Sequence, residues 1–360
     1  MIEPTEGQTV DASTVGDVAI PTDMVKAQGR GVAFFLEAGA LLLLVPVALY
    51  FWFIHQYGVN AIYYDQWNDV ALLTHTPYYI SSFSGVSAYS GHTSIGMLWY
   101  QHNESRTFFP NLITLVLGAL THLNTLTELY LSALLHLIAV SLVIVAHRRD
   151  VARLRLIFYL PVAFLMLTLG QFENILFGYE LSWCLVIATL AAAIFFLDDP
   201  KFGWLVFVAA VVMAVIGSYS ALQGLLIWPA GLVVLLWKHR PRVFVVTWLI
   251  SAIATTCLYF YHFDFSAAGG SHGYVLSHPA SAVEFFFFDI GDIVGKPLPV
   301  RPGASDPAIV VAGVAVFLLV VACLTIYGRR RTLSRSPVGP ALISFGILFD
   351  VMKERSAAPA

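Results

Sequence analysis

The stretch "YELSWCLVIATLAAAIFFL", residues 179–197, carries one charged side chain, Glu180. An α-helix needs about 20 predominantly apolar residues to cross a bilayer, so this stretch predicts a membrane-spanning helix. The whole chain of 360 residues is similar: 58% of its residues are hydrophobic and 11% are charged, and its mean hydropathy is +0.78. Soluble domains average about 25% charged residues. The composition therefore predicts an all-α, polytopic transmembrane helix bundle.

Other apolar runs of similar length lie on both sides of this stretch. Together with it they give eight candidate spans, at residues 31–54, 127–146, 155–170, 179–197, 203–219, 221–237, 243–262 and 308–327. Two further runs, 108–123 and 337–349, are shorter than a confident span. We expect eight to nine spans in all. We also expect a disordered cytoplasmic tail over 1–25, a transmembrane domain over 26–336, and a short segment over 337–360 that stops partway through the fold.

Lysine and arginine set the expected orientation, because cytoplasmic loops are enriched in these residues. Suppose that the N-terminus is cytoplasmic and that residues 108–123 lie at the membrane surface. Fourteen of the cations before residue 336 then fall inside, and three, Arg106, Lys296 and Arg301, fall outside. A span at 108–123 would remove this bias. We therefore expect an interfacial helix there.

Two large outer loops follow from this topology, at residues 55–126 and 263–306. The second contains "VEFFFFDIGD" (283–292), which is apolar at its centre and acidic at both ends. We interpret it as a second interfacial helix that either covers a lipid-facing cleft or docks on the membrane. The expected location is the cell membrane, with the active site on the outer face.

The first outer loop contains "YYDQWND", residues 63–69. On a helix, Asp65 and Asp69 would share one face, where two like charges repel. The motif is a solvated loop, a helix start capped by Asp65, or the source of a general base. A base must lie within hydrogen-bond reach of the hydroxyl that it deprotonates. A carboxylate just after a span suits that role when one substrate is held in lipid, so both residues are candidate catalytic groups.

A second cluster, "HNESR", brings His102, Asn103, Glu104 and Arg106 into five residues. It is either an exposed turn with an ion pair worth at most about 1 kcal/mol or a phosphate clamp. Guanidinium groups bind phosphate oxygens in bidentate fashion, and few other cations are expected outside. We therefore expect these four residues to bind substrate.

The turn "GQFENILFGYE", residues 170–180, places Glu173 and Asn174 at the expected outer mouth of two spans. Ionisable residues at the membrane boundary are candidates for function, so we expect these two residues to bind substrate. The alternative is a solvated turn within an interfacial aromatic belt.

Cysteine and histidine spacing indicates no cofactor. The three cysteines, Cys184, Cys257 and Cys323, lie in apolar spans, which is typical of small buried hydrophobes. The outer histidines lack metal-binding spacing; they are His75, His92, His102, His272 and His278. We expect no resident metal, with a divalent ion held across the loops as the alternative. A net charge of −3 gives no indication of a nucleic-acid partner.

The motifs together resemble the GT-C superfamily of polytopic membrane glycosyltransferases. "YYDQWND", "QHNESRTFFPNLI", "GQFENILFGYELSW" and "SHPASAVEFFFFDIG" also resemble segments of a bacterial subgroup with HNExR-type and QxEN-type motifs. The resemblance covers roughly residues 31–330. It implies a sugar donor carried on a polyprenyl phosphate, transfer of the inverting type with little or no dependence on a metal, and a base carboxylate in the first outer loop.

On this resemblance the base is Asp65, with Asp69 as the alternative. Glycosyl transfer passes through an oxocarbenium-like state, and the departing phosphate needs cations or hydrogen-bond donors. Arg106 and His102 would supply these. Glu104, Glu173 and Asn174 would hold sugar hydroxyls.

Sugar transfer to a glycan, lipid or protein acceptor of the cell envelope is therefore the expected function. Its main rival is a transporter or flippase of lipid-linked sugars. Transporters place polar groups near the bilayer midplane and often show internal repeats, whereas here the polar clusters lie at one expected face. A non-catalytic scaffold is the third alternative.

Overall fold

The computed structural model describes residues 39–74, 98–99, 101–151, 154–265, 278–291, 307–329 and 336–346. The fold is mostly helical, 81% helix and 2% strand, which confirms the all-α prediction. The only two strands among the described residues, β1 (Gln101–His102) and β2 (Ser105–Arg106), pair as an antiparallel hairpin.

The α-helices follow one another along the chain. They are α2 (Leu44–Tyr57), α3 (Trp67–Thr74), α5 (Phe108–Thr121), α6 (Thr125–Asp150), α7 (Leu160–Met166), α8 (Phe172–Ile175), α9 (Leu181–Leu197), α10 (Trp204–Ser218), α11 (Ile227–Trp237), α12 (Arg242–Tyr259), α14 (Pro279–Gly291) and α15 (Pro307–Arg329). Short 3-10 helices join or extend them: η1 (Gly39–Leu43), η2 (Tyr64–Gln66), η3 (Leu156–Tyr159), η4 (Leu169–Gln171), η5 (Gly178–Glu180) and η6 (Leu222–Leu226). A last helical segment covers 338–346.

Four helical segments are long and apolar enough to cross a membrane: Thr125–Asp150, Leu156–Ile175, Gly178–Leu197 and Arg242–Tyr259. Five further apolar helices are shorter, at Leu41–Tyr57, Phe108–Thr121, Trp204–Ser218, Leu222–Trp237 and Pro307–Ala322. These lengths support a membrane protein. The expected count of eight to nine spans is not confirmed, because four helical segments of the described residues meet both the length and the apolarity of a full span.

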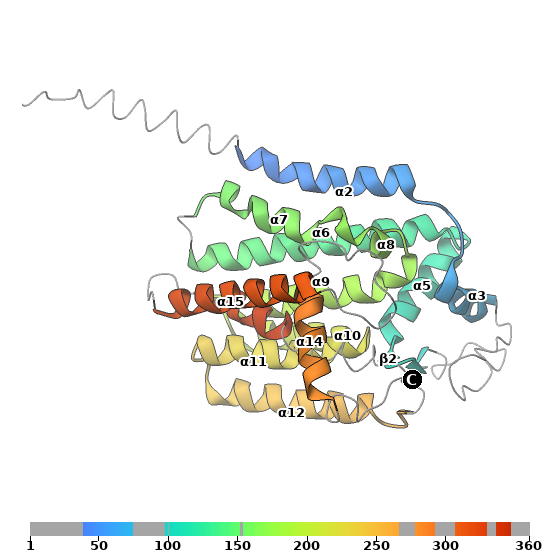
Figure 1. Cartoon of the computed structure of the whole chain (residues 1–360). Coiled ribbons are helices and arrows are strands. Elements are labelled where there is room, and N and C mark those ends of the chain that lie inside the picture. The colour runs from blue at the N-terminus through green and yellow to red at the C-terminus, as the bar shows by residue number, and fades with distance from the viewer. Residues whose placement is uncertain are drawn as a thin grey trace, which may run out of the picture.

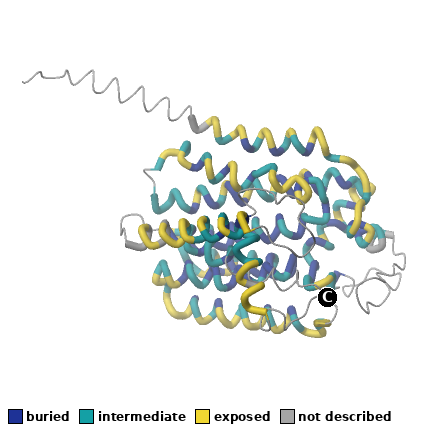
Figure 2. Tube along the Cα trace, viewed as in Figure 1, coloured by how far each residue is buried: buried dark blue, intermediate teal, exposed yellow. Residues whose placement is uncertain are grey.

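The long helices run side by side, and α5 and α14 cross their direction (Figure 1). Helix α9 lies between α6 and α10 and is the most buried of the candidate spans. Figure 2 shows buried positions in the middle of the bundle and many exposed positions on α2 and α12. The exposed positions include large apolar side chains such as Trp52 and Ile253, as expected of helices that face lipid.

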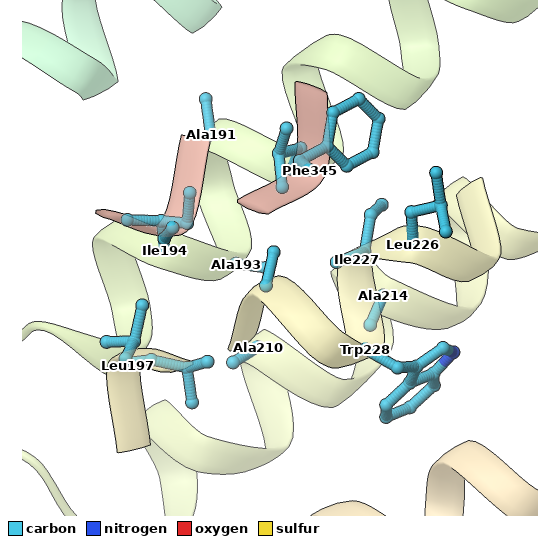
Figure 3. Packing of buried hydrophobic residues seen from close by; sticks show 14 of the residues in the cluster. Ala191, Ala193, Ile194, Leu197, Ala210, Ala214, Leu226, Ile227, Trp228 and Phe345 are labelled. Atoms are coloured by element: carbon cyan, nitrogen blue, oxygen red, sulfur yellow. The ribbon is translucent and has the colours of Figure 1, made fainter. Parts of the chain in front are cut away.

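Small residues let the central helices approach closely. Ala193 of α9 lies near Ala210 and Ala214 of α10, with Ile227 of α11 alongside, and Ala191 points away from them on another side of α9 (Figure 3). Membrane bundles rely on this kind of close packing, because lipid tails are as apolar as the helix surfaces and burial alone gives little driving force.

The closest backbone approach gives a testable prediction. A Cβ atom on Gly224 of η6 would overlap the backbone of Gly217 in α10, whereas one on Gly339 would meet nothing within 4 Å. We expect Gly224→Ala to destabilise the protein by roughly 1–3 kcal/mol through overpacking. Gly339→Ala is the matched control and should leave the unfolding temperature in detergent unchanged or higher; equal effects of the two changes would contradict the prediction.

Charged side chains gather at one end of the bundle, where α6, α9 and α11 end. We call it the basic end. Lys238 Nζ lies 2.8 Å from Asp150 Oδ1 and 2.7 Å from Asp198 Oδ1, and Arg149 Nη2 lies 3.1 Å from Asp199 Oδ2. Burial raises the pKa of Asp198 to about 6, and the ion pair with Lys238 opposes part of that rise. These pairs tie three helix ends together.

The opposite end carries the sequence motifs, and we call it the site end. Here α2, α10 and α12 end, and α6 and α9 begin. Both ends of α5 lie here: the Phe109 amide donates to Tyr219 O after α10, and the Thr125 amide, just beyond α5, donates to Asn60 Oδ1 after α2. Helix α5 therefore lies across the bundle end instead of running its length. This arrangement agrees with the expectation that 108–123 does not span.

Candidate functional site

A carboxylate and an imidazole meet at the centre of the site end. Asp65 belongs to η2, which follows α2 after a short extended segment. Its Oδ2 lies 3.4 Å from His102 Nε2, and the side chains are 32% and 11% exposed. The sequence predicted roles for both residues, but not that they form a pair. A carboxylate that is partly exposed and held by an imidazole can accept a proton from a bound hydroxyl.

The hairpin of β1 and β2 positions His102. Asn103 has a φ of 49°, the left-handed conformation that asparagine tolerates better than most residues. Its Nδ2 lies 3.3 Å from His102 Nε2, so the same ring nitrogen meets Asn103 and Asp65, and the tautomer decides which contact is a hydrogen bond. The His102 ring also contacts Tyr179, with centroids 5.2 Å apart.

Two buried acids lie beside the pair of Asp65 and His102. Asp69 of α3 is 5% exposed and Glu128 of α6 is 4% exposed. The Gln66 amide donates to Glu128 Oε2 at 2.8 Å, which joins η2 to α6. Burial, reinforced by the charges of Glu128 and Asp65, raises the pKa of Asp69 well above its usual range. Of the two candidate bases, Asp65 is thus the exposed one and Asp69 the buried one.

The raised pKa of Asp69 has a measurable consequence. Between the unfolded and the native pKa of this group, the native state holds one more proton, so stability falls as pH rises. Asparagine resembles the protonated acid and carries no such penalty. We expect Asp69→Asn to stabilise the protein relative to wild type, by an amount that grows from acidic to alkaline pH. Thermal unfolding across pH measures this, with Glu173→Gln as the control; a difference that does not change with pH would contradict it.

The acid that reaches this cluster from the 170–180 turn is not the one expected. Glu173 and Asn174 are exposed on α8. Glu180, two residues beyond Gly178, instead lies near enough to interact electrostatically with Asp65. A Cβ atom on Gly178 would overlap Glu128 and Gln66, so this glycine lets the turn pass directly over the buried acids. Any contacts that Glu173 and Asn174 make with substrate therefore lie at the periphery of the site.

Arg106 is buried among backbone carbonyls and does not form an open phosphate-binding site. It is 3% exposed, and its guanidinium donates to three backbone carbonyls: Nε to Tyr259 at 2.6 Å, Nη1 to Trp99 at 2.9 Å and Nη2 to Tyr261 at 2.7 Å. Its backbone amide donates to the Tyr259 hydroxyl, which donates to Glu104 O. Burial lowers the pKa of Arg106. This geometry favours a role in holding the hairpin to α12 over direct phosphate contact.

Four residues of the cluster did not enter the predicted site: Gln66, Glu128, Tyr179 and Glu180. Glu128 carried a usable signal, since an ionisable residue inside an expected span (127–146) is a candidate for function by default. Gln66 stands inside the quoted "YYDQWND" motif. Glu180 stands beside Glu173, and sequence alone does not tell which of two neighbouring acids turns inward.

The metal alternative stays a prediction. His75, His92 and His272 lie outside the described residues. Among the residues that are described, no three His, Cys, Asp or Glu side chains come together as metal ligands.

Comparison with known proteins identifies no relative. No family model, curated protein or solved structure matches the chain. The likeness to the GT-C superfamily therefore rests on the sequence motifs alone, and a function has to be argued from the geometry of the site end.

Proposed function

We propose that this protein is an integral membrane glycosyltransferase, which moves a sugar from a polyprenyl-phosphate donor to an acceptor of the cell envelope. The observation that carries the proposal is the contact of 3.4 Å between Asp65 and His102 at the site end. It joins the first outer motif to the second, which are more than thirty residues apart in sequence.

In this proposal Asp65 is the general base. It deprotonates the acceptor hydroxyl, which attacks the anomeric carbon as the bond to the phosphate breaks. His102 orients the carboxylate and, when protonated, donates to the leaving phosphate. Asp69 is the alternative base, but its burial makes it the less accessible of the two.

The other predicted residues take supporting roles. Asn103 contacts His102 and would fix its ring. Arg106 holds the hairpin. Each of its two terminal nitrogens has a second N–H that donates to no carbonyl among the described contacts, and these two N–H groups could donate to a phosphate. Glu104, Glu173 and Asn174 would hold sugar hydroxyls at the rim of the site. No metal is required by this scheme.

The proposed membrane placement follows the charges. The basic end would face the cytoplasm, as the positive-inside rule expects, and the site end would face outward. The shorter apolar helices would then complete eight to nine spans with local thinning of the bilayer. Helices α5 and α14 would lie at the outer interface.

A transporter of lipid-linked sugars is the second candidate, and one observation favours it. Glu128 is buried within a candidate span, and ionisable groups inside the membrane often mark substrate or proton pathways. The two functions differ in their products, because only a transferase makes a new glycosidic bond.

The test compares cell-envelope glycans and glycolipids by mass spectrometry in three strains: one with the gene deleted, one complemented with the intact chain, and one complemented with Asp65→Asn at equal expression. Loss of a sugar on deletion, return with the intact chain and continued loss with Asp65→Asn support the proposal. Transmembrane movement of a lipid-linked sugar that persists after both Asp65 and Asp69 are neutralised would favour the transporter.

A further inference from the structure

A line of polar side chains continues from the buried acids into the apolar bundle. Glu128, Ser132 and His136 follow one another at four-residue spacing on α6, so they share one face of that helix. They lie against Tyr50 of α2 and Cys184 of α9. We call these five residues the inner stripe.

From Ser132 downward, members of the inner stripe contact one another. The His136 ring stands 5.9 Å from the Tyr50 ring, and its Nδ1 lies 3.2 Å from Ser132 O. Cys184 lies beside Ser132. The Ser132 hydroxyl is buried, and among the described residues it makes no hydrogen bond of full geometry, although the Cys184 thiol, a weak partner, lies within its reach. A buried hydroxyl without a partner costs about 1–3 kcal/mol, which an ordered water molecule would recover.

The top of the inner stripe concentrates negative charge without a cation. Asp69 and Glu128 are both more than nine-tenths buried, and within the described part of the chain no ion pair joins either of them to Lys, Arg or His. Two ionised carboxylates in such a place would be very unfavourable, because burial penalises each charge and the charges repel. A single proton held between them removes most of this cost.

The bottom of the inner stripe is closed. Below His136 the buried face of α6 continues with Ala139, Val140, Val143 and Ala146, which offer no polar group. From Glu128 to His136 is eight residues, or about 12 Å at 1.5 Å per residue. The stripe therefore leads from the site end partway into the membrane and stops.

We propose that the inner stripe is a proton-binding site that opens only to the site end. Asp69 and Glu128 hold one proton between them, and water beside Ser132 passes protons between this pair and the imidazole of His136. No other bond changes: the carboxyl group that loses the proton becomes a carboxylate, and the imidazole that gains it becomes an imidazolium. The proposal is independent of sugar transfer and applies equally to a transporter.

Other titratable groups face this site, and their charges would modulate it. Asp65 of η2, His102 of the hairpin and Glu180 of η5 lie outside the inner stripe, and Tyr50 of α2 and Cys184 of α9 are members of it. Helices α5 and α7, which also pack on α6, contain no titratable side chain. Glu173 of α8 is exposed.

Infrared spectroscopy of the purified protein in lipid nanodiscs tests whether Asp69 and Glu128 hold a proton. Wild type at neutral pH should show the C=O stretch of a protonated carboxyl group, and this band should weaken or shift in Glu128→Gln and in Asp69→Asn. Glu173→Gln, an exposed acid at the same end, is the control and should keep it. A wild type without the band, or a band unchanged in both variants, overturns the proposal. If Glu128→Gln does not fold, Glu128→Asp should shift the band, and an unshifted band counts against the proposal.

Hydrogen exchange tests whether water enters the inner stripe. The S–H stretch of Cys184, identified by its loss in Cys184→Ser, should convert to S–D after transfer to D2O, because water in the stripe reaches the thiol. A Cys184 thiol that stays unexchanged in the folded protein shows a dry stripe and overturns the water path. Neither measurement depends on enzymatic activity, so failure here and failure of the transferase proposal are distinguishable.

Discussion

Replacing Asp65 with asparagine will lower the rate of sugar transfer by about 10²–10⁴-fold, the usual contribution of a general base. The asparagine side chain has nearly the same shape but cannot accept the acceptor's proton. Asp65 is partly exposed and its contact with His102 is a surface ion pair at most, so stability should change by less than about 1 kcal/mol. The loss should appear in kcat more than in KM, because the proton moves in the transition state.

The measurement is transfer from a lipid-linked donor in membranes or nanodiscs, with the protein quantified and its unfolding temperature checked. Glu284→Gln is the control, since it neutralises an exposed acid to which the scheme gives no role and should retain most activity. Asp69→Asn separates the two candidate bases: a large loss there with full activity in Asp65→Asn would contradict the assignment and make Asp69 the base.

Much of the fold could be predicted because it follows from composition and from runs of apolar residues. The helix around Leu181–Leu197 and its neighbours were expected within a few residues of their observed bounds. The span count was harder, because several apolar runs fall just short of a full span. The helix Trp204–Ser218 has almost the same bounds as the run 203–219 in the sequence, and it stays below the length of a full span.

Sequence motifs predicted several residues of the site, and the packing in the structure corrected which of them lie together. Asp65 and His102 were chosen separately, since no pattern in a single sequence indicates that a loop will fold the hairpin back onto η2. Glu173 and Glu180 look alike in sequence, and the tight turn at Gly178 decides which lies near Asp65. Arg106 looked available because few outer cations were expected, but its partners are backbone carbonyls, which sequence does not show.

Replacing Arg106 with lysine will destabilise the protein by roughly 2–4 kcal/mol. The guanidinium serves carbonyls of Trp99, Tyr259 and Tyr261 from three different nitrogens, and one ammonium group cannot reach all of these positions. Each buried carbonyl left without a donor costs about 1–3 kcal/mol. Chemical unfolding in detergent micelles measures the change. Arg242→Lys is the control, because Arg242 is exposed at the start of α12 and should change stability by less than about 0.5 kcal/mol.

The same variant distinguishes the two roles of Arg106. If the side chain mainly holds the hairpin, Arg106→Lys lowers stability, and activity falls through loss of the position of His102. If it mainly binds phosphate, the fold survives and KM for the lipid-linked donor rises, because lysine keeps the charge but loses bidentate contact. The buried carbonyl contacts predict the first result. A variant as stable as wild type with a raised KM would contradict this result and show that Arg106 mainly binds the phosphate.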